Sequence, residues 1–225
     1  MVMTPPTRLS TRMAGTSLHS EAAARNAAMT RLRDEHRALA RVIEALESIT
    51  AQIVEAGIEP DFGLLAAMLY YLDVAPDKLH HPKEDRYLFR ALREHDPGAA
   101  PLIERLEREH RRSPELVAEL ERTLVHWQGG APDGRDGFAV AVARFCEFSW
   151  AHMRTEEAEI LPAAERCLDD ADWMAMAEAF SSNDDPLFGL QRRAEFDRLY
   201  HRIANLSPRK LKLSLLKLAP ERSGS

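Results

Sequence analysis

The segment LHHPKEDRYLF, residues 79–89, brings two histidines and two carboxylates close together in the chain. Its His80 and Glu84 are four residues apart, so on a helix they lie on the same face, one turn from each other. An imidazole and a carboxylate at this spacing can bind one metal ion, or the carboxylate can bridge to a second ion. The segment therefore suggests a metal site that is built on a helix.

The same pattern occurs twice, because each half of the chain holds a Glu-His-Arg triplet followed by a His-x-x-x-Glu pair. The triplets are residues 35–37 and 109–111. If each half folds as a hairpin of two helices, packing the hairpins about a pseudo-two-fold axis makes six groups converge. These groups are His36, His80, Glu84, His110, His152 and Glu156.

Four histidines and two glutamates are about the number of ligands that two metal ions need. If both glutamates bridge, positions remain for water, an oxo or hydroxo bridge, or a small ligand. Mixed nitrogen and oxygen ligation suits iron, manganese or zinc. The two cysteines, Cys146 and Cys167, are too far apart in the sequence to suggest a thiolate zinc site. Carboxylates on an apolar helix face would be costly to bury without a metal or another partner.

Four segments carry apolar residues at spacings of three and four, which is typical of helices packed in a bundle. The segments are residues 32–53, 63–93, 103–124 and 138–167. A Gly- and Pro-rich loop, GGAPDGRDG, precedes the last of them. Because no segment shows the alternation of a strand, the sequence predicts an all-α fold, an antiparallel up-and-down four-helix bundle.

Three regions are expected along the chain. Residues 1–20 are rich in Thr, Ser, Pro and Arg and are expected to form a disordered arm. Residues 21–168 are expected to form the bundle. Residues 169–225 are expected to form a helical C-terminal extension, with short helices over 173–180 and 191–206 and a basic, apolar tail.

Composition excludes several classes of function. The formal charge of −6 argues against a nucleic-acid surface, which needs clustered Lys and Arg. No apolar run approaches the length of a membrane span, and the N-terminus lacks the apolar core of a secretory signal. The low cysteine content fits a reducing compartment, so the expected location is cytoplasmic.

The arrangement resembles the hemerythrin-like, or HHE cation-binding, family, and HHPKEDRYLF is similar to the second-helix motif of its bacterial branch. The similarity covers about residues 28–168. It implies a bundle that holds two iron ions, with zinc or manganese as possible substitutes, joined by an oxo or hydroxo bridge. The family pattern assigns the metal pair to His80 and Glu84 and leaves His81 as a neighbour.

From the residues alone, the choice between His80 and His81 stays open at one point. If the helix begins at Pro82, His81 replaces His80 as the ligand. If the helix continues through Pro82, the missing backbone donor predicts a kink or a widened turn where this helix meets the metal.

One departure from the family bears on function. The oxygen-carrying members place a second histidine one turn after the first on the third helix, and this position is Pro114 here. One metal is therefore expected to have fewer imidazoles and an open position, which favours a sensor or reactive centre over a dedicated oxygen carrier.

The expected function is a non-haem di-iron protein that binds or senses oxygen, peroxide, nitric oxide or iron. The alternatives are a di-iron oxidase, peroxidase or nitric oxide-consuming enzyme, and a structural bundle filled with zinc. The expected partner is a small diatomic ligand or peroxide. The sequence leaves the redox partner and the oligomeric state open.

Overall fold

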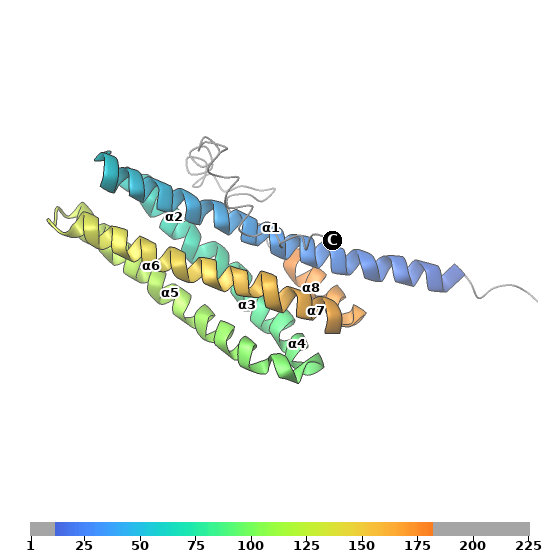
Figure 1. The fold of residues 1–225 in the computed structure, drawn as a ribbon. Helices are drawn as coiled ribbons and strands as arrows, with labels where there is room; N and C mark the ends of the chain where they lie inside the picture. The colour runs from blue at the N-terminus through green and yellow to red at the C-terminus, as the bar shows by residue number, and fades with distance from the viewer. Residues whose placement is uncertain (1–11, 182–225) are drawn as a thin grey trace, which may run out of the picture.

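The computed structural model describes residues 12–181, which form four long helical runs that alternate in direction (Figure 1). The first run is α1 (Arg12–Ala56). The second joins α2 (Phe62–Val74), η1 (Ala75–His80), α3 (His81–Lys83), η2 (Glu84–Phe89) and α4 (Arg90–His95). The third is α5 (Ala100–Gln128), which follows the short η3 (Pro97–Ala99). The fourth joins α6 (Gly134–Thr155), η4 (Glu156–Ile160) and α7 (Leu161–Cys167).

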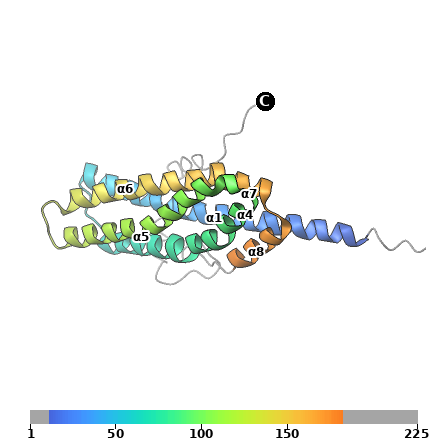
Figure 2. The ribbon, with the colours of Figure 1, turned by 90° about the horizontal axis from the view of Figure 1, so that it is seen from below.

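The predicted all-α four-helix bundle is confirmed, and no strand occurs in residues 12–181. A further helix, α8 (Asp170–Ser181), packs beside α1 and corresponds to the short helix predicted over 173–180 (Figure 2). The predicted helix over 191–206 and the basic tail lie outside the described residues. Within residues 12–181, none of the helices is both long enough and apolar enough to cross a bilayer.

The start of α1 differs from the prediction. The helix begins at Arg12, inside the region that the composition predicts to be a disordered arm. Its first turns extend past the rest of the bundle in both views (Figures 1 and 2). The boundary expected near residue 20 therefore does not coincide with the beginning of the helix.

The turn between α1 and α2 follows from local chemistry. Gly57 has a φ of 64°, a left-handed conformation that ends many helices and that glycine adopts at little cost. Asp61 then caps α2, because its side chain accepts a hydrogen bond of 2.9 Å from the backbone N–H of Leu64. Gly57 therefore ends the first helix, and Asp61 begins the second.

In the part of the chain that the structure describes, two apolar clusters make up the core, and polar residues separate them. On α1, His36 lies between Leu32 of one cluster and Leu39 of the other, and His110 has the same position on α5. The cluster nearer the α5–α6 loop includes Leu46, Leu69, Leu120 and Phe138. The cluster nearer α8 includes Phe89, Ile103, Trp173 and Phe180. Each large apolar side chain that is fully buried contributes about 1.5–3 kcal/mol, so the clusters hold the polar layer in place.

The second and fourth runs contain π-helical turns at this polar layer. The segment η2 begins at Glu84 and η4 begins at Glu156, while η1 ends at His80. At the end of η1, the N–H of His81 donates to the carbonyl of Pro76, five residues back. The widened turn predicted from Pro82 is therefore confirmed. Such turns are rare and occur frequently at functional sites.

Candidate metal centre

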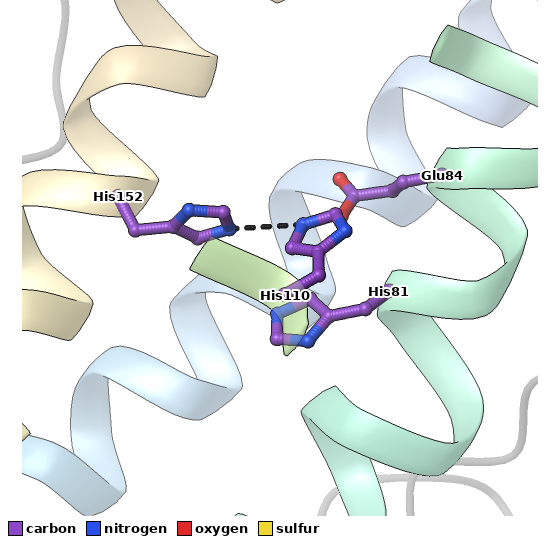
Figure 3. Close-up of side chains that lie close together, drawn as sticks. All are labelled: His81, Glu84, His110 and His152. Carbon is purple, nitrogen blue, oxygen red and sulfur yellow. Dashed lines mark hydrogen bonds and ion pairs between the residues drawn. The ribbon is translucent and has the colours of Figure 1, made fainter. Parts of the chain in front are cut away.

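Side chains from all four helical runs meet in the polar layer between the two apolar clusters. They form two groups of potential metal ligands, and within each group one nitrogen or oxygen atom per residue lies within 4.8 Å of the others. The first group is His36, His80, Glu84 and Glu156, and the second is His81, Glu84, His110 and His152. All seven residues are buried. Figure 3 shows the second group, with its side chains converging from α3, η2, α5 and α6.

All six residues predicted from the repeat are brought together here. Each of the two glutamates lies beside histidines of both groups. One oxygen of Glu84 is 3.1 Å from Nε2 of His80, and its other oxygen is 3.6 Å from Nε2 of His110. For Glu156, one oxygen is 3.3 Å from Nε2 of His36 and the other is 3.2 Å from Nε2 of His152. Each carboxylate thus has the placement that a bridging ligand requires.

The remaining ring nitrogen of each of the four predicted histidines contacts a carboxylate. On the second and fourth runs, Nδ1 of His80 lies 2.7 Å from Glu35 and Nδ1 of His152 lies 2.8 Å from Glu109. Glu35 and Glu109 therefore lie where a group that orients an imidazole would be placed. Such a carboxylate fixes the tautomer and the orientation of a metal-binding imidazole, leaving Nε2 free for the metal.

The two other histidines pair crosswise between the hairpins. Nδ1 of His36 lies 2.9 Å from Glu157, and Nδ1 of His110 lies 2.8 Å from Asp85. Glu157 and Asp85 directly follow the two glutamates of the centre, so each hairpin orients a histidine of the other. The sequence repeat contains these carboxylates, but their crosswise pairing depends on how the helices pack.

The sequence does not predict that His81 lies in the centre together with His80, yet the structure places both there. The His81 ring stacks on that of His110, with centroids 4.1 Å apart, and it belongs to the second group of potential ligands. The signals in the sequence are the histidine doublet itself and Asp77, one turn before His81. The sequence treats the two histidines as alternatives for one ligand position, and the structure places both side chains in the layer, beside the π-helical turns.

The donor set fits a cation. All four carboxylate oxygens of Glu84 and Glu156 are buried, and none accepts a hydrogen bond within residues 12–181. Buried carboxylates without hydrogen bonds are costly, and most buried polar atoms in proteins make one. Imidazole nitrogens and carboxylate oxygens together suit iron, manganese or zinc. The geometry therefore matches a site for such ions.

Without a metal, the carboxylates retain protons on the imidazoles. Burial by itself lowers the pKa of these histidines, but the neighbouring carboxylates outweigh it and raise the pKa of His36, His80 and His152 to about 10 and that of His110, beside Asp85, to about 9. Burial likewise raises the pKa of Glu84 and Glu156, and the facing histidines outweigh it, so both lie below their usual value. For His81, burial dominates and lowers the pKa to about 4.

The metal-free protein should therefore be most stable near pH 6. The stabilisation from the four histidines with raised pKa is complete below about 6.5, their unfolded value, and is lost as the pH rises through 9 to 10. The glutamates and His81 have lowered pKa values, so their contribution is lost on the acidic side.

A pKa shift of one unit corresponds to about 1.4 kcal/mol of stability. If the histidines lose that much as the pH rises, the melting temperature of a chain of this size falls by about 3–5 °C. Thermal unfolding of chelator-treated protein at pH 6 and pH 10 measures this decrease. The metal-loaded protein is the control, because metal replaces the protons and its stability should fall on acidification instead. A metal-free melting temperature that rises from pH 6 to pH 10 would contradict the assignment.

A third group, His95, Asp169 and Asp172, is more exposed and has a structural explanation. The N–H of Asp172 donates to the side chain of Asp169, and the N–H of Asp169 donates to the side chain of Asp172, which caps α8. His95 adds an ion-pair contact of 2.8 Å to Asp172. These contacts connect the end of α4 to the beginning of α8.

Comparison with known proteins agrees with the geometry. The model of the hemerythrin HHE cation-binding domain matches residues 27–164, a range that includes every residue of the polar layer. No curated protein and no solved structure matches the chain. Because the matched range covers more than half of the 225 residues, the protein belongs to the hemerythrin HHE cation-binding domain family.

Proposed function

We propose that the protein holds two iron ions in the polar layer. It either uses them to bind or sense oxygen, peroxide or nitric oxide, or senses iron itself by binding it there. The ligands proposed are His36, His80, Glu84, His110, His152 and Glu156. The single observation that carries the proposal is the placement of Glu84 and Glu156, whose oxygens divide between the two groups of histidines.

The residues have defined tasks in this proposal. Glu84 and Glu156 bridge the two positions and supply the negative charge that offsets two divalent cations. His36 and His80 bind one ion, and His110 and His152 bind the other. The carboxylates on Nδ1 keep each imidazole in the tautomer that binds metal through Nε2. When bound, an iron pair supplies redox chemistry and open coordination positions for a small molecule.

The size of the space beside the centre supports a small ligand. A cavity of about 20 Å³ adjoins His36 and His80 and is lined mainly by apolar side chains, among them Leu39, Tyr71, Pro76 and Leu79. A cavity of this size holds about one water molecule, and a diatomic molecule occupies similar space. A bulky substrate would not fit there.

Purification from iron-replete cells without oxygen tests the proposal. We expect about two irons per chain, and an absorption spectrum that changes on exposure to air as the iron is oxidised. Stoichiometric zinc with no iron would overturn the iron assignment and favour a structural bundle. Repeated turnover with a reductant and peroxide or nitric oxide would instead identify an enzyme, which a binding or sensing protein would not show.

A further inference from the structure

His81 lies in the metal centre although it is outside the repeated His-x-x-x-Glu pattern. It begins α3, between the two π-helical segments, and is 7% exposed. Its ring lies nearly parallel to that of His110, with ring centroids 4.1 Å apart and an interplanar angle of 11° (Figure 3). The centroid of the His152 ring is 5.4 Å away. One of its ring nitrogens is within 4.8 Å of ligand atoms of Glu84, His110 and His152.

Asp77 contacts the other side of this imidazole. Its Oδ1 lies 3.1 Å from Nδ1 of His81, and its side chain is 3% exposed. Within residues 12–181, neither oxygen of Asp77 accepts a hydrogen bond. A buried carboxylate without hydrogen bonds is costly. An imidazole that binds a metal through Nε2 keeps its proton on Nδ1 and can donate it to such a carboxylate. Metal binding by His81 therefore accounts for the position of Asp77.

The pair follows the arrangement of the other four histidines. Each of them has Nδ1 within 2.7–2.9 Å of a carboxylate and Nε2 directed into the layer, as the contacts of His36, His80, His110 and His152 show. His81 and Asp77 repeat this arrangement with a contact that is slightly longer. The shared geometry is that of an oriented ligand, and a histidine that only fills space does not require it.

Comparison of the two hairpins shows that packing does not require the pair. Residues 72 positions later are the counterparts in the repeat, since His80 and Glu84 correspond to His152 and Glu156. By the same offset, Met153 takes the place of His81 and Ser149 takes the place of Asp77. Both are buried, so the bundle packs at the equivalent place without a histidine and a carboxylate. The pair is an addition to the first hairpin alone.

We propose that His81, oriented by Asp77, is a fifth imidazole ligand and binds the metal that His110 and His152 hold. The inference rests on the proposed dinuclear centre. His81 supplies an imidazole from the second helical run. On α5, the position one turn after His110 is Pro114, which cannot supply one. The metal bound by His36 and His80 then has one imidazole fewer than its neighbour, and the cavity of about 20 Å³ adjoins these two histidines.

Anaerobic titration with Fe²⁺ tests the inference on His81→Ala, with chelator competition as the readout. Loss of the imidazole should weaken the affinity for one of the two ions by about 10–100-fold and leave the affinity for the other within about threefold. Desalted protein should then retain about one iron per chain. The matched control is Met153→Ala, which truncates the counterpart in the other hairpin and should keep both irons. His81→Ala with two irons of unchanged affinity would overturn the inference.

Asp77→Asn separates orientation from ligation, because it retains His81 and changes only its partner. It should weaken the same ion about 10-fold, which is less than the loss in His81→Ala. Circular dichroism and melting of the metal-free variants verify that both fold. If Asp77→Asn binds both irons with the affinity of the Met153→Ala control, Asp77 has no orienting role.

A measurement on the unmodified protein does not depend on any variant folding. Protein loaded with Co²⁺ should give one strongly shifted, solvent-exchangeable N–H proton signal for each imidazole ligand, since the carboxylates on Nδ1 slow the exchange of these protons. We expect five such signals, and four would overturn the inference. If the unmodified protein binds fewer than two metals, the proposed dinuclear function fails. If it binds two but shows four signals, only the role of His81 fails.

Discussion

Replacing Glu84 with glutamine should remove both metals at once. Glu84 belongs to both groups of potential ligands, and it is fully buried. Glutamine preserves the volume but offers one neutral oxygen and an NH₂ group, which cannot bind a cation. The substitution also removes one negative charge from beside two divalent ions. We expect the affinity for each ion to fall at least about 100-fold, so that desalted protein contains almost no iron.

Metal analysis and chelator competition measure this loss, and two comparisons make it specific. Glu94→Gln is the matched control, because Glu94 is exposed on α4 of the same helical run and should leave the metal content unchanged. His36→Ala, which affects one group only, should lose one ion more readily than the other. A Glu84→Gln protein that retains two irons at wild-type affinity would refute the bridging role of this carboxylate.

The helices and the six converging residues could be predicted because both depend on spacing along the chain. Apolar residues at spacings of three and four specify which face of a helix is buried, whatever the helix packs against. The repeat then places a histidine or a glutamate at equivalent depths of two hairpins. Because His36 and His110 occupy corresponding positions in the repeat, their convergence follows from the symmetry alone.

The position of His81 could not be predicted in the same way. On a regular α-helix, neighbouring residues are about 100° apart, so assigning His80 to the centre directs His81 away from it. The π-helical turns on both sides of α3 change this relation. Pro82 indicates a disturbed hydrogen-bond pattern, but the sequence does not specify where the additional residue is accommodated. The crosswise contacts of Glu157 and Asp85 likewise depend on interhelical distances, which spacing within one helix does not determine.

Replacing Gly134 with alanine should destabilise the fold far more than the same substitution at Gly137, three residues later. Gly134 is the first residue of α6, and a Cβ atom there would lie 2.4 Å from Cα of Trp127 and 2.9 Å from its backbone nitrogen. Trp127 cannot readily move, because its ring packs on Phe62 at 5.0 Å and on Phe138 at 5.7 Å. The beginning of α6 must therefore separate from the end of α5.

We expect Gly134→Ala to lower the free energy of unfolding by about 1–3 kcal/mol or more, measured by urea denaturation of the metal-free protein. Gly137→Ala is the matched control, since Gly137 lies in the same helix, is exposed, and would place its Cβ at no heavy atom within 4 Å. That substitution should be neutral or stabilise the protein by up to about 1 kcal/mol. Equal stability of the two variants would contradict a rigid contact between α5 and α6.

The metal content of Gly134→Ala should nevertheless remain that of the unmodified protein. At about 1.5 Å per residue, the clash lies about 27 Å along α6 from His152, and the apolar cluster around Phe145 and Leu120 separates the two places. Because metal binds only the folded state, loading should restore much of the lost stability, by an amount that grows with the ratio of metal concentration to Kd. The α5–α6 contact therefore determines how readily the bundle forms, and the polar layer determines what the folded bundle binds.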